Sequence, residues 1–250
     1  MSFVLTKRKG LLLDLDNTLV PTALAFSEAM GRVASHLVER GISEDLAENV
    51  CRRFDVLLRE RPIDPDRKIG YGLWRKGLWE QAMMEILDRS DVSDFSEDVY
   101  RIYRDTVMSR MVFDDVTKNL LVLLDEQYKL GILTNGDSAL QRDKLEHCLA
   151  SKYIQCIVVS GEEGMDKPDP RIFHLACRRL GLVPRQVVMV GDRLSTDIEG
   201  SNLAGLRASV WVRNGLDISC LGQMSRDKRP DYVIDSFHEI ENVLEQIDFD

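Results

Sequence analysis

Two aspartates separated by a single residue follow three consecutive leucines near the start of the chain. The leucines at positions 11–13 have the unbroken apolar character of a strand buried on both faces of a parallel sheet, and Asp14 and Asp16 come at its end. Open α/β sheets bind ligands at the carboxyl ends of such strands. A buried carboxylate is costly unless it is paired, protonated or bound to a metal. The pair therefore predicts a charged site, with solvated aspartates at an ordinary strand end as the alternative.

The sequence beyond this strand changes character twice. Between residues 22 and 112 apolar residues recur at spacings of three and four, as in Phe26, Met30, Val33 and Leu37, which predicts helices. From residue 116 onward short apolar runs alternate with segments long enough for helices, which is typical of parallel βαβ units. The expected strands cover residues 130–133, 154–160, 187–190, 209–212 and 232–234.

We therefore expect an α/β fold in two parts. Residues 1–20 and 113–250 should form a Rossmann-like three-layer core with a parallel sheet. Residues 21–112 should form a helical cap domain inserted after the first strand.

Polar residues also follow the second expected strand. Thr134, Asn135 and Gly136 offer a hydroxyl, an amide and a glycine that lets the backbone approach a ligand closely. A plain strand-to-helix turn, with Thr134 or Asn135 as the helix cap, would explain the same residues. Lys167 stands directly before a proline, so its position is stiff, and it suits a fixed point charge for phosphate, although a surface lysine is usually solvated.

A further buried strand is expected to end in Gly191 and Asp192, and Asp197 follows five residues later. Like Asp14, Asp192 is a carboxylate at the end of an expected buried strand. One divalent cation between the two would stabilise both charges. Each segment separately is weak evidence. Together, at successive strand ends, they predict one site.

Composition excludes some classes of function. A net charge of −9 argues against a nucleic-acid partner, because affinity for phosphate backbones depends on clustered lysine and arginine. The apolar run near the N-terminus is too short for a signal peptide or a membrane span. The five cysteines are odd in number and lack paired metal spacing, as in the reduced thiols of a cytoplasmic protein.

The four motifs, in this order, resemble those of the haloacid dehalogenase (HAD) superfamily. The matching positions are Asp14 to Thr18, Thr134, Lys167, and Gly191-Asp192 with Asp197, and the helical insertion resembles the cap of that superfamily. Within it, the chain most resembles the N-acylneuraminate-9-phosphatase group, in residues 79–82, 133–137, 141–146, 158–162 and 188–192.

The resemblance implies a Mg²⁺-dependent phosphomonoesterase. Asp14 would attack phosphorus and form an aspartyl-phosphate. Asp16 would protonate the leaving alkoxide and then deprotonate the attacking water. The carboxylates of Asp14 and Asp192, with the backbone carbonyl of Asp16, would hold Mg²⁺. Asp197 would act through a coordinated water or orient Lys167.

The resemblance also implies how phosphate is held. The Thr134 hydroxyl, the amides of Asn135 and Gly136, and Lys167 would bind its oxygens. Asp16 argues against a dehalogenase, since a halide leaving group needs no acid. The expected substrate is a phosphorylated small molecule, namely the sugar phosphate N-acylneuraminate 9-phosphate.

A cation of the cap would have to pair with the carboxylate of that substrate. Arg75 is the first choice and Arg104 the second. A broader nucleotide or small-metabolite phosphatase, a phosphomutase and a catalytically silent binding protein stay open as alternatives. We expect a monomer or weak dimer with no membrane partner.

Overall fold

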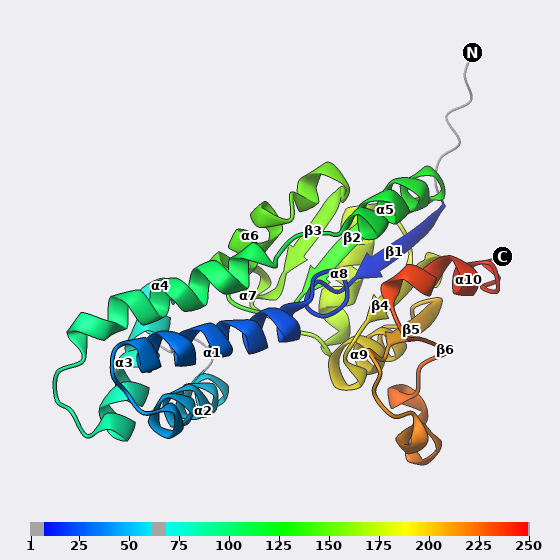
Figure 1. The fold of residues 1–250 in the computed structure, drawn as a ribbon. Helices are drawn as coiled ribbons and strands as arrows, with labels where there is room; N and C mark the ends of the chain where they lie inside the picture. The colour runs from blue at the N-terminus through cyan, green and yellow to red at the C-terminus, as the bar shows by residue number, and fades with distance from the viewer. Residues whose placement is uncertain (1–7, 62–68, 250) are drawn as a thin grey trace. The chain divides into compact units, whose positions relative to one another are not determined.

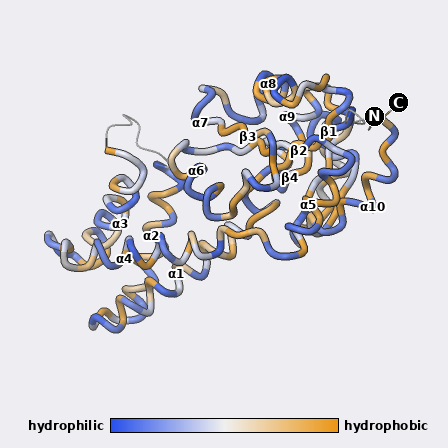
Figure 2. Tube along the Cα trace, turned by 90° about the horizontal axis from the view of Figure 1, so that it is seen from above, coloured by the Kyte–Doolittle hydropathy of each residue, from blue (hydrophilic) through white to orange (hydrophobic). Residues whose placement is uncertain are grey.

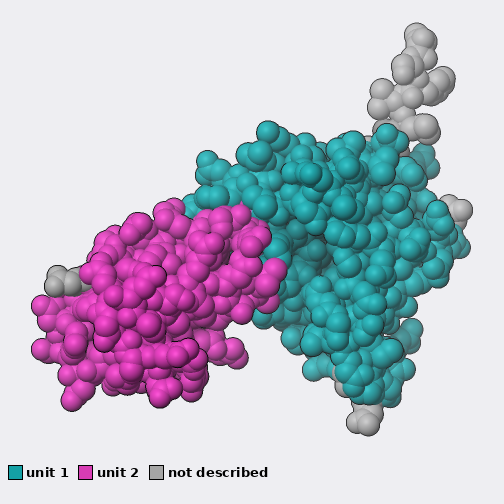
Figure 3. Space-filling model, viewed as in Figure 1, with its two compact units in different colours: residues 1–21, 112–250 teal, residues 22–111 magenta. Residues whose placement is uncertain are grey.

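The computed structural model describes residues 8–61 and 69–249, and it divides into two compact units (Figures 1 and 3). Thr22–Met111 forms the helical unit. The flanking segments, up to Pro21 and from Val112, form the second unit, which we call the core unit. That the helical unit acts as a cap stays a prediction.

The core unit contains a six-stranded sheet in which every pairing is parallel, and the predicted α/β fold is confirmed. The strand order is β3-β2-β1-β4-β5-β6. The order of the strands reverses between β1 and β4, which is where sheets of this kind form a ligand-binding crevice. The strands are β1 Lys9–Leu13, β2 Tyr128–Thr134, β3 Cys156–Val159, β4 Val187–Gly191, β5 Ala208–Val212 and β6 Tyr232–Ile234.

Both faces of the central strands are covered, which explains their unbroken apolar runs. Leu12, with its register partner Met189, packs in a cluster with Phe173 of α8 (Pro170–Leu180). Leu11 and Leu13 point to the opposite face and have no exposed surface. Figure 2 shows α8 and α9 on one side of the strands and α5 and α10 on the other.

Because the strands are parallel, the chain crosses back between them through connections that contain helices. Its α-helices are α5 Asp115–Gln127, α6 Ser138–His147, α7 Ser160–Glu163, α8, α9 Glu199–Leu203 and α10 Ile240–Leu244. A π-helical turn, Leu194–Ile198, follows β4 and carries Asp197.

The described residues of the helical unit form four helices, α1 Thr22–Glu39, α2 Glu44–Glu60, α3 Tyr71–Leu87 and α4 Ser93–Ser109. Phe54 of α2 stacks on Trp79 of α3 with ring centroids 3.7 Å apart, and Tyr103 of α4 meets Phe54 edge-on. These three rings join three helices by the geometries that aromatic pairs prefer. No described helix is long and apolar enough to cross a membrane.

The buried stripe of α1 differs from the predicted one in its first half. Ala25 and Ala29 are fully buried, whereas Phe26 and Met30 keep part of their surface exposed. The helix thus turns its small residues inward, which lets neighbouring helices approach closely. The spacing of apolar residues predicts the helix correctly. It places the larger apolar residues on the buried face, however, and so misses a contact face made of small residues.

Candidate active site

Asp14 is placed by the hydrogen-bonding pattern of the sheet. Its N–H donates to the carbonyl of Val190 on β4 at 2.9 Å, so its backbone continues the pairing of β1 and β4 by one residue. Its side chain is buried. The chain then turns tightly, because the carbonyl of Leu15 accepts from both Leu19 and Val20.

Lys167 joins three parts of the site. Its Nζ lies 2.6 Å from Oδ1 of Asp14, 2.6 Å from Oδ1 of Asp197 and 2.8 Å from the carbonyl oxygen of Leu133 at the end of β2. An ammonium has three donors, and these three oxygens match them in number. The residue is only 3% exposed, so its charge is fixed among the carboxylates.

Asn135 fixes the backbone of Lys167. Its Oδ1 accepts from the Lys167 N–H at 2.8 Å, and its Nδ2 donates to the Lys167 carbonyl at 2.9 Å. This two-bond clamp links the end of β2 to the loop that carries the lysine. The proline after Lys167 predicts a stiff loop, and the Asn135 side chain supplies a contact that the sequence did not indicate.

The site carries more negative than positive charge. Burial raises the pKa of Asp14 to about 8, although the Lys167 ammonium acts in the opposite direction. Burial and the nearby Asp197 carboxylate raise the pKa of Asp192 to about 6. Burial opposes the Lys167 charge, but Asp14 and Asp197 outweigh it and raise the pKa of that lysine. One lysine thus faces three carboxylates, and a second positive charge would stabilise all three.

The donor atoms at this position fit a hard divalent cation. One carboxylate oxygen each from Asp14, Asp192 and Asp197 lie within 4.8 Å of one another, and Mg²⁺ takes oxygen ligands. Asp197 already pairs with Lys167 through Oδ1, and its Oδ2 accepts from the Arg193 N–H at 2.9 Å. Asp14 and Asp192 are therefore the better direct ligands. The backbone carbonyl of Asp16 stays a predicted ligand.

Asp197 reaches this position because residue 191 is a glycine. A Cβ at Gly191 would lie 2.4 Å from the carboxyl carbon of Asp197, a distance that real Cβ atoms essentially never show. Gly191 therefore leaves room for the Asp197 carboxylate directly beside the position of Asp192.

Helix α6 adds two residues to which the sequence analysis assigned no role in the site. Nζ of Lys144 lies 2.6 Å from Oδ1 of Asp16, and Nε2 of Gln141 lies 3.1 Å from Oδ2 of the same residue. Nε2 of Gln141 also donates to the Thr134 hydroxyl oxygen. That hydroxyl keeps its own hydrogen for another acceptor, as the predicted contact with phosphate requires.

The Gly136 amide does not point at a vacant position in this structure. Its N–H donates to Oγ of Ser160 at 3.0 Å. The predicted contact between this amide and phosphate would therefore require Ser160 to be displaced. Glycine at 136 is nevertheless needed, since its φ of 143° lies in the range that L side chains rarely adopt.

Arg75 lies in the helical unit, on the buried face of α3. Its guanidinium lies 4.9 Å from the ring centroid of Tyr71, and its Nη1 lies 3.5 Å from the Tyr103 hydroxyl. It is 8% exposed. Arg104 is exposed on α4. Contact of either arginine with a substrate stays a prediction.

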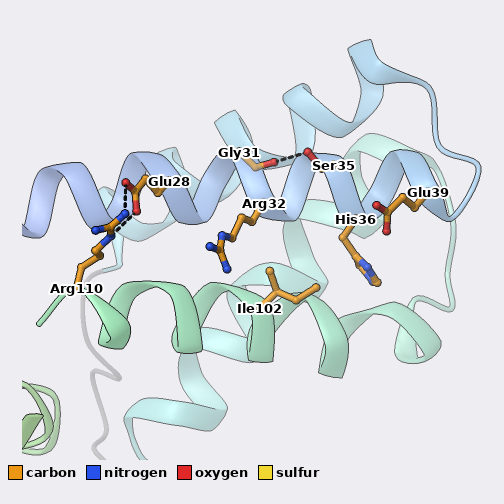
Figure 4. A pocket seen from close by; sticks show the side chains of 8 residues that line it. All are labelled: Glu28, Gly31, Arg32, Ser35, His36, Glu39, Ile102 and Arg110. Carbon is orange, nitrogen blue, oxygen red and sulfur yellow. Dashed lines mark hydrogen bonds and ion pairs between the residues drawn. The ribbon is translucent and has the colours of Figure 1, made fainter.

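The helical unit also has an open groove between α1 and α4, shown in Figure 4. Arg110 and Glu28 form a two-bond ion pair at one end of it, and His36 and Ile102 line it further along. None of its lining residues belongs to the predicted site.

The sequence and the fold of the chain are similar to those of known proteins. A family model described as haloacid dehalogenase-like hydrolase matches residues 8–205. The chain belongs to this family. It is 33% identical over 244 residues to the N-acylneuraminate-9-phosphatase of Mus musculus, covering 98% of this chain and 96% of that one.

Other relatives act on other phosphate esters or are known as structures. The chain is 30% identical over 256 residues to the glyceraldehyde 3-phosphate phosphatase of Methanopyrus kandleri, covering 96% and 98% of the two chains. The crystal structure of a HAD phosphatase from Thermococcus onnurineus matches with a TM-score of 0.59 and 26% identity, covering 94% and 97%. The family match and the similarity to these phosphatases show that the chain is a phosphatase of the HAD family.

Proposed function

We propose that this HAD-family phosphatase is a Mg²⁺-dependent phosphomonoesterase that removes the phosphate of N-acylneuraminate 9-phosphate and releases free sialic acid. The observation that carries the chemistry is the buried Asp14 carboxylate, held 2.6 Å from Lys167 and grouped with Asp192. Similarity to a neuraminate phosphatase over nearly the whole chain supports the substrate.

The reaction has two displacements. In the first, an Asp14 oxygen bonds to phosphorus, the ester P–O bond breaks, and Asp16 gives a proton to the leaving alkoxide. In the second, water attacks phosphorus, Asp16 takes its proton, and the bond to Asp14 breaks. Both steps need charge on the phosphate oxygens to be neutralised and held in place.

The residues of the core unit divide this work. Lys167 and the Thr134 hydroxyl would hold phosphate oxygens, and Asp14 and Asp192 would hold Mg²⁺. When bound, Mg²⁺ supplies the positive charge that the surplus of carboxylates requires. Asp197 orients Lys167 through their 2.6 Å ion pair.

The similarity to glyceraldehyde 3-phosphate phosphatase favours one second candidate, a phosphatase of small phosphorylated carbonyl compounds. A panel of esters assayed with Mg²⁺ and with EDTA separates the two. It should include N-acylneuraminate 9-phosphate, glyceraldehyde 3-phosphate, a nucleoside monophosphate and a hexose phosphate, with a 2-haloacid as the negative control.

The proposal expects the highest kcat/KM for the neuraminate ester and no turnover in EDTA. A preference for glyceraldehyde 3-phosphate or a nucleotide would overturn the substrate and leave the chemistry intact. Isomerisation of the hexose phosphate would indicate a mutase, and full turnover in EDTA would overturn the metal dependence.

A further inference from the structure

Two side chains of α6, one helical turn apart, reach Asp16 from the same side. Gln141 is 1% exposed and Lys144 is 5% exposed, although both are polar. Gln141 donates to Oδ2 of Asp16 at 3.1 Å, and Lys144 donates to Oδ1 at 2.6 Å. Each oxygen of one carboxylate therefore has its own donor, so the orientation of that carboxylate is defined.

Gln141 also links Asp16 to the Thr134 hydroxyl. Its Nε2 donates to both Oδ2 of Asp16 and Oγ of Thr134, which uses the two hydrogens of one amide group. A single nitrogen thus sets the distance between the predicted proton-transfer group and a predicted phosphate-binding group. These two groups belong to different strand ends, because Asp16 follows β1 and Thr134 is the last residue of β2.

Helix α6 is itself firmly placed. Asp137 caps its first turn by accepting from the Leu140 N–H at 3.2 Å. Arg142 forms two bonds of 2.7 and 2.6 Å with Glu162 of α7, and Ser138 adds a third at 3.0 Å. The side chains that reach Asp16 therefore start from a helix that is bonded to α7.

Stability alone does not account for a lysine at position 144. A buried ammonium loses its hydration, and replacing a buried ion pair by apolar residues is often neutral or stabilising. Its partner in this ion pair, Asp16, keeps 27% of its side-chain surface exposed. The buried lysine therefore loses hydration while its partner carboxylate stays partly exposed to solvent, so this ion pair is not explained by a gain in stability.

We propose that Gln141 and Lys144 are positioning residues that hold Asp16 in the orientation for proton transfer; this rests on the proposed function. Each carboxylate oxygen has two lone-pair positions, so an oxygen that accepts one of these bonds still has a position for the transferred proton. That proton passes to the leaving alkoxide as the ester P–O bond breaks, and Asp16 accepts one from water in the second step.

The test compares Lys144→Met and Gln141→Met with wild type. The leaving group released in the first turnover is measured for an alkyl phosphate and for 4-nitrophenyl phosphate, whose leaving group needs little protonation. Each substitution is also made in an Asp16→Asn background. Lys152→Met is the matched control, because Lys152 is an exposed lysine shortly after α6. Thermal midpoints identify variants that fail to fold, and Lys144→Gln then replaces Lys144→Met.

A general acid contributes about 10²–10⁴ in rate, so loss of its orientation should slow first-turnover release from the alkyl ester by about 10- to 100-fold. Release of nitrophenol should change by less than about 3-fold, and the Asp16→Asn background should remove the effect of either substitution. Lys152→Met should match wild type.

Equal losses for both esters, or an undiminished loss in the Asp16→Asn background, would show that α6 acts otherwise and overturn this inference alone. A wild-type protein that hydrolyses neither ester with Mg²⁺ would overturn the proposed function, and this inference with it.

Discussion

Asp14 is buried, which favours a protonated carboxyl group, and it is also the proposed nucleophile, which has to be ionised. Burial raises the pKa of its carboxyl to about 8, whereas a nucleophile has to be ionised. The Lys167 ammonium at 2.6 Å opposes this shift. A divalent cation shared with Asp192 would favour the ionised form further.

Asp14→Asn should lower turnover by at least about 10³-fold, because it keeps the shape of the side chain and removes the nucleophilic oxygen charge. The thermal midpoint should not fall, since the substitution also removes a buried negative charge. Steady-state assays and a thermal melt check the two results. Turnover near the wild-type rate would exclude Asp14 as the nucleophile.

Asp16→Asn should lower first-turnover release from an alkyl phosphate by about 10²–10⁴-fold, the usual range for a positioned acid. Release from 4-nitrophenyl phosphate should fall much less, because nitrophenolate leaves without a proton. Stopped-flow and quenched-flow measurements provide both rates. The same loss for both esters would mean that Asp16 only shapes the metal site.

Some residues of the site could be found from the sequence and others could not. Asp14, Thr134 and Asp192 each stand at the carboxyl end of an apolar strand, and parallel strands bring these ends to one edge of the sheet. Gln141 and Lys144 lie within a helix and not at a strand end, and they contact Asp16, which is more than a hundred residues earlier in the chain. The local sequence of a polar helix face does not indicate that this face will be buried against a carboxylate.

At the scale of elements, strands were easier to predict than contact faces. The expected strand at 232–234 agrees with β6, and that at 187–190 is one residue shorter than β4. The apolar run of β4 is unbroken because every one of its residues is buried. In α1 the period was right but the buried face was wrong at Phe26 and Met30, because Ala25 and Ala29 form the contact.

Arg75 on α3 gives a prediction for the helical unit. Arg75→Ala should raise KM for N-acylneuraminate 9-phosphate about tenfold or more, since a charge-assisted bond to the substrate carboxylate would be lost. KM and kcat for 4-nitrophenyl phosphate should stay nearly unchanged. Arg104→Ala is the matched comparison, because Arg104 was the second candidate.

The contacts of Arg75 with Tyr71 and Tyr103 define the contrary outcome. If Arg75→Ala lowers the thermal midpoint and impairs both substrates alike, Arg75 supports the packing of the helical unit and does not bind the sugar.

For the whole molecule, the surplus of carboxylates predicts a link between metal, pH and stability. The folded pKa values of about 8 for Asp14 and about 6 for Asp192 lie above the ordinary value of 3.8. As the pH rises from about 4 to 8, the metal-free folded protein therefore binds more protons than the unfolded chain, and these two groups lower its stability.

A bound divalent cation favours the ionised carboxylates, so the stabilisation by Mg²⁺ should grow with pH. The shift in thermal midpoint between Mg²⁺ and EDTA should be larger at about pH 8 than at about pH 5.5, and Asp192→Asn should remove most of it. Calorimetry measures both. A shift that does not depend on pH, or that persists in Asp192→Asn, would contradict the metal site.

The central claim, a phosphoryl group carried by Asp14, is tested most directly in Asp16→Asn with an aryl phosphate labelled on phosphorus. The good leaving group departs without an acid, whereas the second step lacks its base, so the phosphorylated protein should accumulate. Acid quenching and peptide mapping should then find the label on Asp14. Release of the phenol with no labelled protein, or with the label on another residue, would contradict the account.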